Sequence, residues 1–251
     1  MSGHSKWKTI QHKKGAADAK RGKVFSKFSK ELMVLAKQGG SNPDSNVGLR
    51  TMITKARQNN MPMDNIERAI KKGAGELEGS QLEEVVYEGF AAGGVAIVIG
   101  ALTDNKKRAA AEIRHIFTRY GTSLAGQGSV TRGFKRKGQI IVDGGAATED
   151  KLMEIVLDAG AEDMHAEEGQ FEIITEPANY LKVVEALEKA KIPTVSSETT
   201  LIPDVYVPVA DKAAASQILR FVSDLEDNDD VQNVYTNMDI SDEILKELEK
   251  E

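Results

Sequence analysis

The chain has 251 residues, about one and two-thirds typical domains, and 40% of them are apolar, which is enough for two or three hydrophobic cores. It contains no cysteine, which excludes disulfides, thiolate nucleophiles and cysteine-ligated zinc and fits a reducing compartment. The longest apolar run, Val95–Leu102, is far shorter than the roughly 20 residues of a membrane-spanning helix. We expect a cytoplasmic protein without a secretory signal.

Residues 1–22 show no sustained apolar periodicity and are predicted to form an extended or conditionally ordered arm. Three helices are predicted after this arm. The first spans Val24–Lys37, with its apolar residues on one face, and the second spans about 46–60. The third opens at Asp64 as N-cap, with an acidic residue three positions later, and ends before Gly73.

After residue 80 the apolar pattern changes to alternation typical of strands, mixed with helices. In chain order, the predicted elements are strands 84–90 and 95–102, a helix that Asp104 caps and that runs to Tyr120, strand 139–142, helix 149–159, strand 171–175, helix 177–191, strands 195–201 and 205–209, helix 211–225, strand 231–235 and a tail helix from Ser241.

The segments 82–121 and 204–236 are each too small to bury both a helix and the face of a strand. We therefore expect them to share one discontinuous α/β domain into which residues 138–202 are inserted, whereas a contiguous two-domain split is the alternative. The predicted fold class is α+β with three domains. Their predicted boundaries are 1–78 for the basic helical domain, 79–137 plus 203–251 for the discontinuous domain, and 138–202 for the inserted domain.

No catalytic or metal-binding motif appears in the sequence. Its four histidines are scattered, and it has no HExxH, GxSxG, P-loop or dinucleotide-binding glycine motif. The acidic turn Asp224–Asp230 has neither the glycine nor the glutamate that an EF-hand calcium loop requires, so we interpret it as a solvated helix end. We expect no enzymatic activity, cofactor, metal or small-molecule substrate.

The formal net charge of −6 hides two opposed regions. Residues 1–72 carry 16 Lys and Arg against 5 Asp and Glu, a net charge of +11, and the remaining residues carry −17. Within this acidic part, residues 106–137 are basic again, whereas residues 138–251 carry −19. A basic region on an acidic body predicts a polyanionic partner. The alternative is that the oppositely charged parts attract each other, within or between chains.

Cations surround the single tryptophan, Trp7, in the arm. Lysines neutralise phosphates while an indole stacks on an unpaired base, a combination used for single-stranded or looped nucleic acid. The alternative, that Trp7 anchors the arm on the helical module, stays open. Three cations after Asn105 lie in the first helical turn, where the helix dipole disfavours them. Residues 132–137 are basic too, and an edge strand protected by lysines is the preferred interpretation.

The candidate nucleic-acid-binding residues are the cations and the tryptophan of the arm, the helical module and the 106–108 cluster. They are His4, Lys6, Trp7, Lys8, His12, Lys13, Lys14, Lys20, Arg21, Lys23, Lys27, Arg50, Lys55, Arg57, Lys106, Lys107 and Arg108.

Several longer motifs make the chain similar to the YebC/PmpR family. They are Gly3–Trp7, Asn60–Pro62, Asp64–Gly73, Tyr87–Phe90, Gly93–Ile97, Thr103–Asn105, Arg114–Phe117, Tyr120–Gly121, Gly128–Val130, Phe134, Lys137–Gly138 and Ile192–Pro193. The resemblance covers essentially the whole chain. It implies a cytoplasmic protein of three domains around a large cleft, with the third inserted in the second. Arg132–Gly133 departs from the family pattern and makes that loop more basic.

The resemblance implies a DNA-binding transcriptional regulator, and relatives with a translational or ribosome-linked role imply the alternative of an RNA-binding translation factor acting on rRNA or tRNA. The segment 39–46 between the first two predicted helices is too long for a helix-turn-helix, so the residues favour RNA slightly. A protein that binds acidic protein surfaces is the third possibility. The sequence leaves the oligomeric state open.

Overall fold

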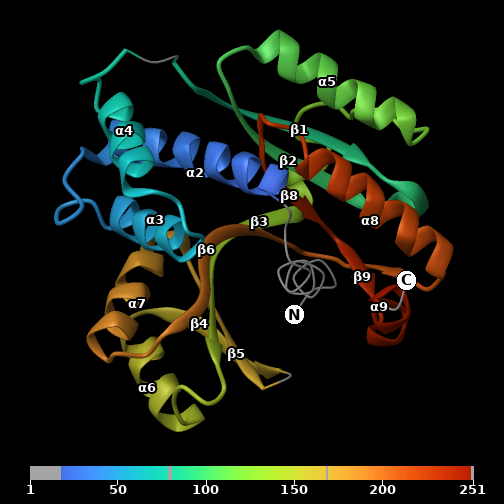
Figure 1. The fold of residues 1–251 in the computed structure, drawn as a ribbon. Helices are drawn as coiled ribbons and strands as arrows, with labels where there is room; N and C mark the ends of the chain where they lie inside the picture. The colour runs from blue at the N-terminus through green and yellow to red at the C-terminus, as the bar shows by residue number, and fades with distance from the viewer. Residues whose placement is uncertain (1–17, 79–80, 168, 250–251) are drawn as a thin grey trace.

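The computed structural model describes residues 18–78, 81–167 and 169–249. The first helix of the described residues, α2 (Asp18–Gly39), packs against α3 (Val47–Gln58) and α4 (Met63–Gly73) around a core that includes fully buried Leu32, Leu49 and Ile66 (Figure 1). The chain is already helical at Asp18, so the prediction that the arm extends to residue 22 was wrong. The alanine, lysine and arginine residues that precede Gly22 are good helix formers, which accounts for the earlier start.

Capping differs at two of the predicted helix starts. α4 begins after Pro62, whose backbone is extended, and not at the predicted cap Asp64, which lies in the first turn. Asn105 caps α5 (Lys106–Arg119) in place of the predicted Asp104, since its side-chain oxygen accepts a hydrogen bond from the N–H of Arg108 at 3.1 Å. Both differences are shifts of one or two residues in elements whose type was predicted.

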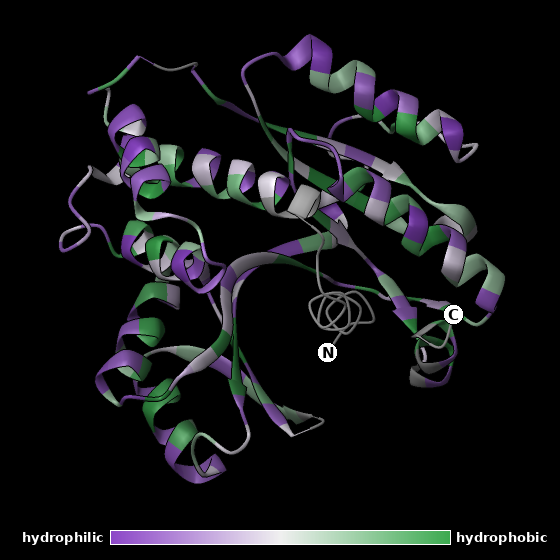
Figure 2. Ribbon diagram, in the orientation of Figure 1, coloured by the Kyte–Doolittle hydropathy of each residue, from purple (hydrophilic) through white to green (hydrophobic). Residues whose placement is uncertain are grey.

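The second domain is built on a three-stranded antiparallel sheet in the order β1-β2-β8. Its strands are β1 (Glu83–Phe90), β2 (Ala96–Thr103) and β8 (Val231–Thr236), with the short 3₁₀ turn η1 (Ala92–Gly94) between the first two. α5 and α8 (Lys212–Glu226) pack on one face of the sheet. Phe134 packs with Val98 on the other face. Because both faces of β2 are covered, this strand is almost entirely apolar (Figure 2).

Three short elements complete this domain. β7 (Val207–Val209) pairs in parallel with β9 (Met238–Ile240), and α9 (Asp242–Glu249) follows. β9 was not predicted, because three residues are too few to establish an alternating pattern. Leu245 of α9 is buried in the same core as α8.

The third domain is a four-stranded antiparallel sheet in the order β4-β5-β3-β6, packed against α6 (Glu149–Asp158) and α7 (Pro177–Lys189). Its strands are β3 (Phe134–Asp143), β4 (Ala161–Glu167), β5 (Gln170–Thr175) and β6 (Thr194–Pro203). The order of elements is therefore βαββαβ, and the predicted βαβαβ omitted β4. This edge strand carries mostly polar residues, so its sequence lacks the apolar signal.

β3 and β6 are long paired strands that run from the second domain into the third (Figure 1). β8 follows this excursion in the chain and returns to pair with β2. The predicted fold class, α+β with three domains, is confirmed. The residue boundaries given for the domains and the large cleft between them stay predictions. Within the described residues, no helix is both long and apolar enough to cross a membrane.

Candidate nucleic-acid interface

Seven of the candidate residues lie in segment 1–17, outside the described part of the chain. They are His4, Lys6, Trp7, Lys8, His12, Lys13 and Lys14. Lys20 and Arg21 belong to the first turns of α2. The other candidate residues lie in the described part, on α2, α3 and α5.

Three lysines of α2 contact the C-terminal end of α8 and the loop that follows it. Lys23, Lys27 and Lys30 are four and three residues apart, so they share one face of α2. Lys23 Nζ donates to the carbonyl oxygen of Asp227 at 2.9 Å, and Lys27 Nζ donates to that of Glu226 at 2.7 Å. These carbonyls end a helix, where they lack an intrahelical partner and carry the negative end of the dipole. Lysine ammonium groups therefore dock α2 on the second domain.

Asp230 is the centre of this contact and is only 3% exposed. Its Oδ1 accepts a hydrogen bond from Lys30 Nζ at 2.8 Å, while its Oδ2 accepts from Arg108 Nη2 at 2.8 Å and from Thr103 Oγ1 at 3.0 Å. Burial alone would raise the pKa of Asp230, but the hydrogen bonds from Lys30 and Arg108 outweigh it and hold the pKa below its usual value. Asp230 thus stays ionised and joins α2 to the start of α5.

The acidic turn Asp224–Asp230 is therefore not the solvated helix end that was predicted. Its carbonyl groups and Asp230 receive the lysines of α2, from a segment 200 residues away along the chain. Among the described residues, no group of three or more histidines and acids is placed to hold a metal ion. Part of the opposite charge of the two regions is thus matched within one chain. A nucleic-acid role for Lys23 and Lys27 stays a prediction.

Two of the candidate cations of α3 lie near acidic residues of the third domain. Arg50 Nη1 donates to the carbonyl oxygen of Pro43 at 3.3 Å, and its Nη2 lies 4.0 Å from Oε2 of Glu188. Lys55 Nζ lies 3.5 Å from Oε2 of Glu198 in β6. The candidate Arg57 is exposed.

A half-buried carboxyl group, that of Glu31, accompanies Lys55 at this junction. Burial raises the pKa of Glu31 in α2 above its usual value, while the charge of Lys55 opposes the shift and that of Glu198 adds to it. One lysine thus lies beside two carboxyl groups from different domains.

The three cations at the start of α5 have different surroundings. Lys106 Nζ lies 2.5 Å from Oε2 of Glu83, and Arg108 Nη2 donates to Asp104 at 2.9 Å as well as to Asp230. These carboxylates offset the unfavourable position of the cations in the first helical turn. Lys107 is exposed. Of the predicted cluster, Lys107 is therefore the residue most open to a partner.

The basic segment 132–137 forms the end of η2 (Thr131–Gly133) and the first half of β3. Over residues 134–137 this strand pairs with β6 alone, so its other side is an edge, and Lys135 Nζ lies 2.8 Å from Asp204. The preceding loop is held by Glu88, which is 3% exposed and accepts hydrogen bonds from three backbone N–H groups. Burial alone would raise the pKa of Glu88, but these N–H groups lower it below its usual value.

Lys30 is a central residue of the interface between the first two domains, but it was not among the candidates. Its Nζ also donates to the carbonyl oxygens of Leu102 at 3.1 Å and Asp229 at 2.8 Å. The spacing of Lys23, Lys27 and Lys30 is the sequence signal that identifies a basic helix face. The acceptors of that face are mostly backbone carbonyl oxygens, which no side-chain pattern in the sequence marks.

Comparisons with known proteins agree over almost the whole chain. The family model described as TACO1/YebC protein N-terminal domain matches residues 5–76, and that described as TACO1/YebC second and third domain matches residues 82–238. Proteins named "Probable transcriptional regulatory protein" are similar to this chain in Syntrophobacter fumaroxidans and Geobacter sulfurreducens. The first is 52% identical and the second 51%, each over 99% of this chain and 100% of the relative.

A solved structure has the same fold. It is the crystal structure of a conserved hypothetical protein, Aq1575, from Aquifex aeolicus. It is 46% identical to this chain and superposes with a TM-score of 0.81, covering 91% of this chain and 94% of the Aquifex chain.

Proposed function

Because the chain belongs to the TACO1/YebC family, we propose that it is a regulatory protein that binds nucleic acid through its basic N-terminal region. The proposed target is duplex DNA in the control of transcription, as the names of the relatives suggest. RNA, alone or on the ribosome, is the second candidate. The proposal places the protein in the cytoplasm and assigns it no catalytic activity.

The proposal rests on which cations of the basic region already have partners within the chain and which do not lie among them. Lys23, Lys27 and Lys30 contact the end of α8 and Asp230, so the acidic surface nearest to α2 is already in use. The segment 1–17 adds four lysines and two histidines without one acidic residue. This charge supports contact with a separate polyanion, since phosphates are neutralised by clustered lysines.

The connection between α3 and α4 bears on the choice between DNA and RNA. It has four residues, the length of the turn in a helix-turn-helix motif, and Asn60 within it has a φ of 61°. However, the first turns of α4 expose Asp64 and Glu67, whose carboxylates would repel a phosphate backbone. This favours contact through the arm over groove reading by α4 and keeps RNA as the second candidate.

Salt-dependent binding of the full chain tests the proposal. Fluorescence anisotropy with a 20-nucleotide RNA, the same DNA strand and its duplex compares the wild type with a variant in which Lys6, Lys8, Lys13 and Lys14 are changed to Ala. If each lysine neutralises one phosphate, the slope of log K against log salt becomes shallower by about 3. The far-ultraviolet circular dichroism should not change.

A matched control removes the same charge from another exposed surface. Lys151, Lys182, Lys189 and Lys191 are exposed in the third domain, and changing all four to Ala should leave the slope at its wild-type value. Equal slopes for the arm variant and the wild type would contradict the proposal. So would an equal loss in both variants, because that would reflect net charge alone.

The target is identified by ultraviolet cross-linking in cells, comparing the full chain with a deletion of residues 2–17 that retains α2. Chromosomal fragments lost with the arm support a role in transcription, whereas ribosomal or transfer RNA lost with it supports the second candidate. In vitro, competition between the RNA and the matching DNA strand isolates the contribution of the 2′-hydroxyl. If no nucleic acid is attached to either form, both candidates fail and the hypothesis of an acidic protein partner remains.

A further inference from the structure

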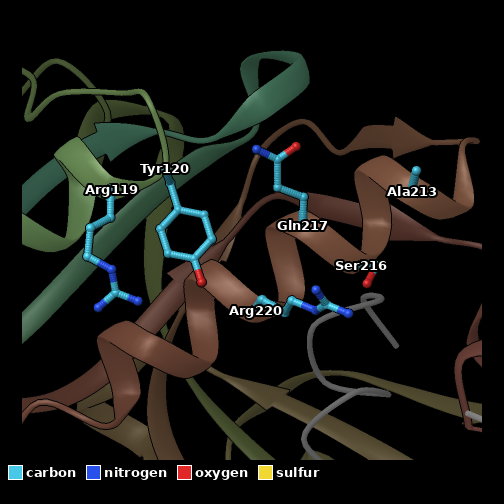
Figure 3. A pocket seen from close by; sticks show the side chains of 6 residues that line it. All are labelled: Arg119, Tyr120, Ala213, Ser216, Gln217 and Arg220. Carbon is cyan, nitrogen blue, oxygen red and sulfur yellow. The ribbon is translucent and has the colours of Figure 1, made fainter.

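A hollow of about 690 Å³ lies beside the C-terminal end of α5 (Figure 3). Four residues of α8 line it at spacings of three and four, so they form one face of that helix. The last residue of α5 and the C-cap residue that follows it close the other side. The lining residues are Arg119, Tyr120, Ala213, Ser216, Gln217 and Arg220. Five of these six side chains carry hydrogen-bonding groups, so the hollow suits a polar ligand better than an apolar one.

The α5 side of the hollow is held in place by packing and hydrogen bonds. The ring of Tyr120 stacks on Phe221 with their centroids 4.8 Å apart. Its hydroxyl group donates to Oδ2 of Asp224 at 2.7 Å, and Arg119 Nη2 donates to the same oxygen at 2.6 Å. The wall is therefore ordered before any ligand arrives, which reduces the entropic cost of binding.

The charge around the hollow is positive. Asp224 balances one of the two guanidinium groups, which leaves Arg220, and Arg220 is exposed. In Figure 3 the guanidinium group of Arg220 extends along α8 toward Ser216, while that of Arg119 lies on the far side of Tyr120. Two guanidinium groups on either side of a phenol, together with a hydroxyl group, are donors that suit phosphate oxygens.

The surroundings indicate a polymer in preference to a small anion. Lys107 and Arg114 are exposed on α5 at a spacing of two helical turns, so cations continue along this helix away from the hollow. The C-terminal end of α8 lies in the same direction, because Arg108 near the start of α5 contacts Asp230. Asp224 of α8 lies one turn before the helix end where Lys23 of α2 docks. The hollow is thus close, along α8, to the helix that follows the basic arm.

We propose that this hollow between α5 and α8 binds backbone phosphates of the nucleic acid that the arm contacts. Arg220 would neutralise a phosphate, and Arg119, whose charge Asp224 balances, would donate hydrogen bonds to phosphate oxygens together with Ser216 and Gln217. The inference rests on the proposed function, since it extends the path of the same ligand. It adds a contact on the second domain.

The test is the salt dependence of binding by Arg220→Ala in the full chain, with the same RNA and duplex DNA probes. Loss of one phosphate contact should reduce the slope of log K against log salt by about 0.9 on the duplex or about 0.7 on the single strand. The control is Lys182→Ala, which removes one exposed positive charge from α7 and should retain the wild-type slope. Thermal unfolding of both variants should match the wild type, because both side chains are exposed.

The outcomes separate this inference from the proposed function. If the wild type binds and the arm variant does not, while Arg220→Ala keeps the wild-type slope, the proposed function stands and the inference is overturned. An equal loss in Arg220→Ala and Lys182→Ala also overturns it. If the wild type binds neither probe, both fail. Saturable binding of inorganic phosphate that requires Arg220, without any change in oligonucleotide binding, would assign the hollow to a small anion and overturn the inference.

Discussion

Asp230 joins the helical domain to the second domain, so its replacement by Ala should weaken the docking of α2. The carboxylate is 3% exposed and accepts hydrogen bonds from Lys30, Arg108 and Thr103. Removing it leaves the buried Thr103 hydroxyl group without its acceptor and Lys30 without its counter-charge. Such a loss is costly because Thr103 is fully buried and the side chain of Lys30 is largely buried.

The size of the effect follows from what each partner retains. Breaking a buried ion pair costs about 3–5 kcal/mol when the remaining charge has no other partner. Lys30 keeps the carbonyl oxygens of Leu102 and Asp229, and Arg108 keeps Asp104. The expected cost is therefore lower, at about 2–3 kcal/mol.

Hydrogen exchange is the appropriate assay, because a chain of three domains does not unfold in a single two-state transition. The loss of about 2–3 kcal/mol corresponds to amide exchange in α2 that is about 30- to 150-fold faster where exchange reports the docking equilibrium. Exchange in the third domain should not change.

Asp229→Ala is the matched control for this experiment. Asp229 is exposed and contributes its backbone carbonyl oxygen to Lys30, which the substitution retains, while the same negative charge is removed. The free energy of opening that exchange reports in α2 should stay within about 0.5 kcal/mol of the wild-type value. If Asp229→Ala and Asp230→Ala accelerate exchange in α2 equally, the contact is a diffuse charge effect and the role given to Asp230 is refuted.

Two further predictions concern burial and close packing. Glu88→Gln should destabilise the second domain by about 2 kcal/mol, because a neutral amide is a weaker acceptor for three backbone N–H groups. The pKa of Glu88 is lowered on folding, so the ionised carboxylate should contribute to the free energy of unfolding above about pH 4.5, and this contribution should decline as the pH falls below that value. Chemical denaturation of the wild type from pH 7 to 3 should show the decline, and the Gln variant should not. Gly73→Ala would place a Cβ 2.2 Å from the backbone oxygen of Met33 and should lower the free energy of unfolding by about 1–3 kcal/mol. Gly22→Ala is the matched control: its Cβ would have nothing within 4 Å, and alanine favours a helix over glycine, so this variant should raise the melting temperature. Equal melting temperatures for both glycine variants would contradict the close approach of α2 and α4.

The helices of the first domain and the buried strand of the second were predictable because each has a local periodic signal. Leu32, Leu49 and Ile66 lie on apolar faces with helical spacing, and all three are fully buried. β4 lacked such a signal, since an edge strand satisfies its backbone through β5 without burying most of its side chains. The expectation that segments 82–121 and 204–236 share one domain came from their size and not from any residue pattern, and the pairing of β2 with β8 was not predicted.

The sequence by itself determined the division of charge, the spacing of Lys23, Lys27 and Lys30, and the presence of a basic arm before them. Only the tertiary structure decided which of these cations are occupied, because the acceptors at Glu226, Asp227 and Asp230 lie about 200 residues away along the chain. Backbone carbonyls at a helix end are the same group in every residue, so no side-chain pattern marks them as partners for lysine. The hollow between α5 and α8 was also decided by the tertiary structure alone, because it forms where two helices that are far apart in the sequence pack together.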